Sequence, residues 1–248
     1  KIVDLGMGDA EPNRELMPPI EAIQAELRSE RLDGWLFYDF HHRDPIAARV
    51  LGLHGGMGTR RWFYLIPQDG QPRKLVHRIE SAVLDRLPGK KVMYASLDEL
   101  KKNLRSMLSG CRTVAMQYSP RNAIPYVSLV DAGTVELVRA QGARVVSSAD
   151  LVQRFEACWS PAQYRSHLEA GRVIHDVISG AFARAALHAR GTAGSALTEY
   201  DLQQWILKQF RADGLVTEDS PIVAVGRHAG DPHYEPHPHG SSRIRAGD

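Results

Sequence analysis

The sequence changes character at Ser160, and this change constrains the fold more than any other feature. Ser160, Pro161 and Gln163 form a strong helix start: a hydroxyl cap, a proline at the first helical position, and a glutamine that reaches back to the cap. No further proline occurs before Pro221, so one long amphipathic helix can run close to His188. We therefore expect the chain to divide near this point into two domains, residues 1–158 and 159–248.

The second part carries two helical patterns and then an apolar run. Thr198 caps the second helix, with Asp201 three residues later, and the pattern ends before Gly214. The apolar run 222–226 predicts a strand, and we expect a further strand to begin near the last residues. The residues expected to face inward are Ile174, Val177, Ile178, Ala181, Phe182 and Ala185 on the first helix, and Leu202, Trp205, Ile206 and Phe210 on the second.

The first part, from about residue 17 to 157, alternates helix-like and strand-like segments. Short apolar runs predict strands at 35–38, 62–66, around 75–76, 92–94, 113–116 and 145–146. The turn residues Asp69 and Gly70 favour an antiparallel hairpin. Helical stripes are expected at Ile20, Ile23 and Leu27; at Leu97, Leu100, Leu104 and Leu108 after a Ser96–Glu99 capping box; and over 123–141, broken near Gly133. Strands interleaved with helices predict an α/β domain with a mixed sheet.

The bulk composition excludes several classes of protein. A formal net charge of +2 over 248 residues gives no argument for nucleic acid or a membrane surface as a partner. No apolar stretch approaches the roughly 18 residues that span a bilayer. Cys111 and Cys158 lie far apart and form no CxxC pair, so we interpret both as buried thiols in a reducing compartment. The cytoplasm is the expected location.

A histidine-rich loop, 228–239, is the densest group of chemically active side chains. Imidazole and carboxylate groups ligate zinc, manganese or cobalt, but the loop lacks the helical spacing that would favour a metal site. His233 differs from its neighbours because Pro232 and Pro236 stiffen the backbone on both sides of it. A histidine held in this way can stabilise charge on a carbonyl oxygen, so His233 is the candidate catalytic residue. His228, His237 and His239 are interpreted as exposed loop residues.

Other motifs point less clearly to chemistry. The chain has no GxSxG elbow, P-loop lysine motif or Rossmann glycine fingerprint. The glycine-rich segment 54–58 is interpreted as a flexible loop, and the pair Arg60 and Arg61 either guards a pocket or flanks a strand. The group Asp39, His41, His42, Arg43 and Asp44 follows a strand, where functional loops occur, but solvated loop charges are the favoured interpretation.

From Ser160 onward the chain resembles the pita-bread metallopeptidases, which include Xaa-Pro aminopeptidases, prolidases, creatinases and methionine aminopeptidases. The resemblance lies in an ordered set of motifs, and residues 17–157 resemble the creatinase-type N-terminal domain of the proline-specific branch. The matching segments are Trp159-Ser160-Pro161, Leu197-Thr198-Glu199-Tyr200-Asp201-Leu202, the run 220–226, Asp231-Pro232-His233-Tyr234 and Ile244-Arg245-Ala246-Gly247-Asp248. Together these imply an N-terminal mixed-sheet domain followed by the beginning of an α+β pita-bread catalytic domain.

The resemblance also implies a function. His233 matches the loop histidine that contacts substrate and stabilises the tetrahedral intermediate. The family holds two divalent ions, manganese, cobalt or zinc, through residues that would follow Asp248, so no metal ligand is assigned here and the chain alone is expected to be inactive. Within the family we favour a homodimeric Xaa-Pro dipeptidase or aminopeptidase acting on proline-containing di- or oligopeptides. The alternatives are a creatinase-like hydrolase that needs no metal, and a non-catalytic peptide-binding pseudo-peptidase.

Overall fold

The computed structural model of the chain describes residues 18–53, 58–191 and 194–248. These residues belong to two compact units, the first ending at Cys158 and the second comprising Trp159–Asp248. In the described ranges no helix has the length and apolar character needed to cross a bilayer.

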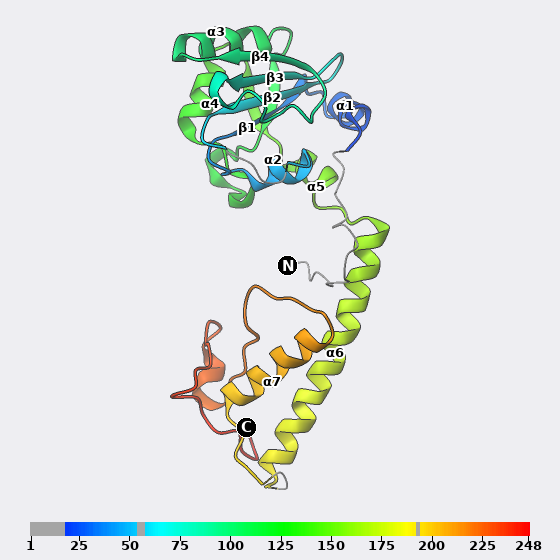
Figure 1. Ribbon diagram of the computed structural model, residues 1–248, viewed down its shortest axis with the longest axis vertical. Coiled ribbons are helices and arrows are strands. Elements are labelled where there is room, and N and C mark those ends of the chain that lie inside the picture. The colour runs from blue at the N-terminus through cyan, green and yellow to red at the C-terminus, as the bar shows by residue number, and fades with distance from the viewer. Residues whose placement is uncertain (1–17, 54–57, 192–193) are drawn as a thin grey trace. The chain divides into compact units, whose positions relative to one another are not determined.

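The first unit contains a six-stranded mixed sheet with the order β4-β3-β2-β1-β5-β6. β1 pairs with β2 and β2 with β3 in antiparallel fashion, and the other neighbouring pairs are parallel. The sheet and its helices are drawn in Figure 1. The strands are β1 (Gly34–Asp39), β2 (Trp62–Pro67), β3 (Arg73–His77), β4 (Lys90–Tyr94), β5 (Thr113–Met116) and β6 (Arg144–Ser147). The predicted mixed sheet and its hairpin are confirmed, and Gly70 adopts the positive φ of 86° that this turn requires.

Helices cover both faces of this sheet. The helices are α1 (Ile20–Ser29), α2 (Pro45–Val50), α3 (Leu97–Met107), α4 (Ala132–Arg139) and α5 (Ala149–Phe155), with 3₁₀ turns η1 (Arg78–Glu80), η2 (Pro120–Asn122) and η3 (Pro125–Val127). Side chains alternate along β1: Trp35 packs with α1, α2 and α5, whereas Leu36 packs with α3 and α4. Because both faces are covered, β1 and β2 are buried at every position, as continuous apolar runs predict.

Several local predictions for the first unit need correction. The capping box of Ser96 and Glu99 is present, but Leu97 is half exposed rather than inward, because it sits at the first helical position, outside the buried stripe. The helical segment predicted for 123–141 is confined to α4, and Gly133 lies inside its first turn rather than at a break. Asp131 sets this start, since its side chain accepts the amide hydrogen of Thr134. The short helices α2 and α5 were not predicted.

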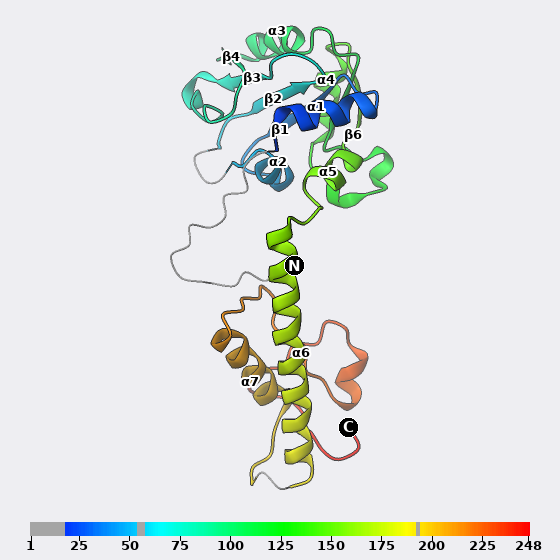
Figure 2. The ribbon, with the colours of Figure 1, turned by 90° about the vertical axis from the view of Figure 1, so that its right-hand side faces the viewer.

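The second unit is built on two helices, the long α6 (Pro161–Ala189) and α7 (Glu199–Ala212). Both predicted capping boxes are present, at Ser160 and at Thr198, and the two helices lie side by side in both views (Figures 1 and 2). Gly180 permits this contact, because a Cβ atom there would approach the Trp205 ring to 2.9 Å. The small core between them contains Ala181, Leu197 and Leu202, with Ala185, Trp205 and Ile206 packed against it.

Two predictions for this unit are wrong. Ile178 and Phe182 are exposed, 49% and 74% respectively, since the buried stripe of α6 follows Val177 and Ala181. The predicted strand at 222–226 has extended backbone at Val225 but no ladder partner in the described part of the chain. It leads into the 3₁₀ turn η4 (Gly226–Gly230). The nearest feature to a second sheet is one isolated antiparallel bridge between Thr198 and Arg243.

Candidate functional site

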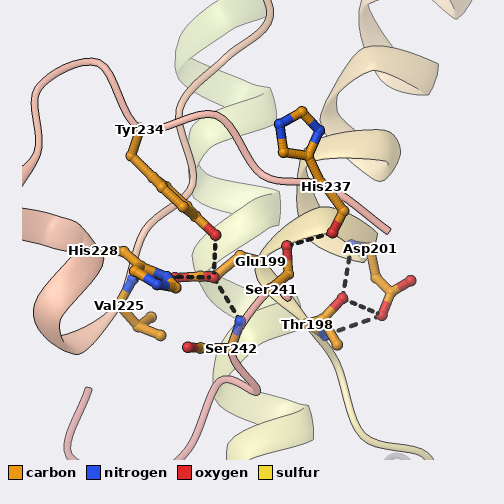
Figure 3. Close-up of polar contacts among 9 residues, drawn as sticks. All are labelled: Thr198, Glu199, Asp201, Val225, His228, Tyr234, His237, Ser241 and Ser242. Carbon is orange, nitrogen blue, oxygen red and sulfur yellow. Dashed lines mark hydrogen bonds and ion pairs between the residues drawn. The ribbon is translucent and has the colours of Figure 1, made fainter. Parts of the chain in front are cut away.

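A buried glutamate, Glu199, organises the irregular segment that carries the candidate histidine. Its side chain has no solvent exposure, and its carboxylate accepts hydrogen bonds from four groups (Figure 3). The backbone amides of Val225 and Ser242 donate at 2.8 and 2.7 Å, and the Tyr234 hydroxyl donates at 2.7 Å. The Nδ1 atom of His228 lies 3.0 Å from each carboxylate oxygen. We call these five residues the Glu199 cluster.

The start of α7 fixes Glu199 in this position. Thr198 caps the helix and its hydroxyl donates to Asp201 at 2.7 Å, so Glu199 occupies the first helical position. The backbone amide of Glu199 donates to the Ser242 carbonyl at 3.0 Å, while its side chain accepts from the Ser242 amide. The Ile244 amide donates to the Leu197 carbonyl at 2.9 Å. Backbone hydrogen bonds therefore hold the start of α7 against residues 242–244. They place the Glu199 carboxylate where it contacts the segment from Val225 to Ser242.

The electrostatics of the cluster favour an ionised glutamate. Burial raises the pKa of the Glu199 carboxyl group, but the hydrogen bonds from Val225, Tyr234, Ser242 and His228 outweigh burial and hold the pKa below its usual range. Burial raises the pKa of the Tyr234 phenol, and its hydrogen bond to Glu199 raises it further. The Tyr234 and His228 rings stack with centroids 4.2 Å apart. A carboxylate, an imidazole and a phenol thus form one connected unit.

His233 lies next to this cluster in sequence but not in its hydrogen bonding. Its side chain is exposed, and its backbone amide donates to Asp231 at 2.9 Å. The following residue, Tyr234, is the one anchored to Glu199. The loop backbone at His233 is therefore held by Asp231 on one side and by Tyr234 on the other.

The interpretation of His228 as an exposed loop residue is wrong. Only 15% of its side chain is exposed, because the ring packs on Tyr234 and pairs with Glu199. His237 and His239, by contrast, are exposed as expected. The importance of Glu199 was missed, since a glutamate in the first turn of a helix is ordinary and its partners lie 26 to 43 residues later in the sequence. No local pattern reveals such a contact.

The described residues do not supply a metal site. In the segments that the structure covers, no three His, Cys, Asp or Glu side chains gather as metal ligands. Glu199 and His228 are two neighbouring side chains of the types that ligate metals. However, the carboxylate oxygens of Glu199 already accept hydrogen bonds from two backbone amides and a phenol. A divalent ion would have to displace these donors, so no chemical step is assigned to a metal here.

The first unit contains a second group of buried charges, at the loop after β1. Asp39 and Asp44 are 4% and 3% exposed, so the interpretation as solvated loop charges is wrong for both, whereas His41, His42 and Arg43 are exposed. Asp39 accepts the Asp44 amide at 3.0 Å, and Asp44 in turn accepts the Ala47 amide at 2.8 Å as the cap of α2. Among the atoms described, Asp44 Oδ2 has no hydrogen-bond partner.

Asp44 makes the stability of the first unit depend on pH. Burial raises the pKa of its carboxyl group to about 7, and the charge of Asp39 adds to this. Since the folded pKa lies above the unfolded value of 3.8, the favourable contribution is complete below pH 4 and is lost as the pH rises through 7. We expect Asp44→Asn, which keeps the cap to Ala47, to remove this loss. The test is urea unfolding at pH 5 and pH 8, followed by the NMR signals of the Trp35 and Trp62 indoles. An equal pH dependence in variant and wild type would contradict it.

The cysteines depart from expectation. Cys111 is partly buried, with its thiol 3.7 Å from the Asp33 carbonyl, but Cys158 is exposed. The interpretation of both as buried thiols is therefore wrong for Cys158.

Of the glycine-rich segment 54–58, which was interpreted as a flexible loop, residues 54–57 lie outside the described residues.

Comparison with known proteins gives a likeness of fold. No protein-family model matches the sequence, and no curated protein matches it. Among the solved structures that are similar to this chain are three peptidases. The dipeptidase PepE from Mycobacterium ulcerans is 19% identical with a TM-score of 0.56, over 92% of this chain and 57% of that one. A dipeptidase from Pyrococcus horikoshii OT3 is 19% identical with a TM-score of 0.53, over 91% and 58%. A recombinant prolidase from Thermococcus sibiricus is 14% identical with a TM-score of 0.53, over 96% and 59%.

At these identities the likeness concerns the fold and not the chemistry. The chain spans less than three fifths of the length of each of these peptidases. The resemblance drawn from the motifs is confirmed at this level: over nearly all of its length, the chain has the fold of the dipeptidases and prolidases.

Proposed function

We propose that this chain is part of a metal-dependent Xaa-Pro peptidase, a dipeptidase or aminopeptidase that hydrolyses the bond before proline in short peptides. The observation that carries the proposal is the ordered loop around His233, held by buried Glu199 within a peptidase fold. The ordered motifs, from the capped α6 to the Asp231-Pro232-His233-Tyr234 loop, support the same function. The complete protein would take its two divalent ions, manganese, cobalt or zinc, through residues outside this chain.

In this proposal His233 is the catalytic residue and also contacts the substrate. Its exposed imidazole donates a hydrogen bond to the carbonyl oxygen of the scissile bond as negative charge builds there. Glu199 acts at a distance by anchoring Tyr234, so that the loop need not reorganise when the substrate binds. We further propose that the complete protein is a cytoplasmic homodimer.

The substrate class can be tested directly with the complete protein. Ala-Pro and Ala-Ala are compared as substrates with manganese, cobalt or zinc added, and again after treatment with EDTA. The proposal expects hydrolysis of Ala-Pro alone, lost with EDTA. Hydrolysis that survives EDTA would favour a creatinase-like mechanism without metal, and binding of Ala-Pro with no hydrolysis would favour a peptide-binding pseudo-peptidase.

The chain of 248 residues by itself is expected to bind no stoichiometric manganese, cobalt or zinc. One histidine and a fully occupied glutamate offer too few ligands for a hard, charge-balanced site. Elemental analysis after dialysis checks this, with a His237→Ala, His239→Ala double variant as the control for loose binding by the loop. Two metal ions per chain in both proteins would contradict the prediction.

A further inference from the structure

The first unit has a cavity of about 740 Å³ that the proposed function does not use. It lies at the carboxyl ends of β1, β3 and β4, from which Tyr38, His77 and Tyr94 contribute to its wall. β1 and β3 are both antiparallel to β2, and β4 is parallel to β3, so these three ends meet at one edge of the sheet. This is the edge at which open α/β sheets bind ligands.

Three arginines, Arg43, Arg60 and Arg61, line this cavity. In the described ranges no carboxylate lies within ion-pair distance of any of them. Asp131 is the one acidic residue among the described lining residues, and both of its oxygens accept hydrogen bonds from Thr134, at 2.9 and 2.8 Å. The described lining therefore carries three guanidinium charges against the one carboxylate of Asp131, and the Glu80 carboxylate lies just outside it, on the backbone amide of Arg60.

Hydrogen bonds hold the backbone at two of these arginines, Arg60 and Arg61. The Arg60 amide donates to Glu80 at 3.0 Å, and the Tyr94 hydroxyl donates to the Arg61 carbonyl at 2.7 Å. The Arg43 guanidinium lies 5.4 Å from the centre of the Phe40 ring. Arg61 is half-buried, so its charge has lost part of its hydration. A partly desolvated guanidinium held in this way favours a bound anion.

We propose that this cavity binds the oxyanion group, carboxylate or phosphate, of a small ligand whose apolar part lies against the aromatic wall. Guanidinium groups bind both anions through paired hydrogen bonds. Tyr38, Phe40 and Tyr94 supply the apolar surface beside the arginines. The starts of α3 and α4, capped by Ser96 with Glu99 and by Asp131, also line the cavity.

The test measures binding of inorganic phosphate and of succinate to the purified chain by calorimetry at low ionic strength. We expect saturable binding of at least one of them, weakened roughly tenfold by Arg61→Gln, because a charge-assisted hydrogen bond contributes on this order. Arg43→Gln, on an exposed residue, should weaken the same anion. Arg105→Gln is the matched control, since Arg105 is an exposed arginine of α3 outside the cavity lining.

The two ligands separate the possible sources of the anion. If only phosphate shows saturable binding, the ligand carries a phosphate group. If only succinate does, the ligand carries a carboxylate group. The proposal is overturned if neither anion binds. It is also overturned if Arg105→Gln weakens anion binding as much as Arg61→Gln does, because that would indicate attraction to net charge only. The NMR signals of the buried Trp35 and Trp62 indoles report whether each variant is folded; if Arg61→Gln is not, Arg43→Gln decides. The assay needs no catalysis, so its outcome is independent of the proposed peptidase activity.

Discussion

Replacing Glu199 by glutamine is expected to lower the free energy of unfolding of the second unit by about 3 kcal/mol. The carboxylate is fully buried and accepts from Val225, Tyr234, Ser242 and His228. A glutamine has one acceptor oxygen, and its NH₂ group would face hydrogen-bond donors, so at least one buried donor is left without a partner. The change is measured from denaturant-dependent hydrogen exchange of the amides in α7.

Glu169→Gln is the matched control, because Glu169 is exposed on α6 in the same unit and its loss should change stability by less than about 0.5 kcal/mol. The Glu199 contribution also has a predicted pH dependence. Since its folded pKa is depressed, its contribution is complete above the unfolded pKa of 4.5 and is lost as the pH falls through the folded value. A Glu199→Gln chain as stable as the Glu169→Gln chain would show that the cluster does not hold the unit together.

Replacing His233 by alanine in the complete protein is expected to reduce kcat about a hundredfold on an Xaa-Pro dipeptide with saturating metal, with a smaller change in KM. One donor to a developing oxyanion contributes roughly 3 kcal/mol to the transition state. Folding should be unaffected, because the His233 side chain is exposed and makes no hydrogen bond within the described segments.

The control for this experiment is chosen from the other histidines of the same loop. His228 is unsuitable, since it pairs with Glu199 and its loss would disturb the whole loop. His237 belongs to the same loop and its side chain is exposed, so His237→Ala should retain full activity. Unchanged kcat in His233→Ala would remove the catalytic assignment. A comparable loss in His237→Ala would indicate that the loop responds to any substitution.

The features that the sequence predicts correctly are those encoded locally. Each capping box, at Ser96, Ser160 and Thr198, depends on two residues three positions apart, and all three are present. The strands β1 and β2 were predicted because helices bury both of their faces, which requires continuous apolar runs. The class of fold followed from the alternation of these signals.

The features that could not be predicted depend on distant partners. A strand needs a neighbour as well as an apolar run, and the segment 222–226 finds no ladder partner in the region described. Its polar backbone is instead satisfied in part by Glu199, which accepts the Val225 amide. Asp44 looks like any loop aspartate until α2 folds over it and buries the carboxyl group. Burial and pairing of single polar residues are properties of the tertiary structure.

Amide hydrogen exchange in the wild-type chain tests most directly whether Glu199 orders the loop around His233. The amides of Val225 and Ser242 lie outside any helix or strand, yet both donate to a fully buried carboxylate. The structure predicts that both exchange more than a hundredfold more slowly than in an unfolded chain, which corresponds to an opening free energy of about 3 kcal/mol. Exchange of both amides at the unfolded rate would contradict the account.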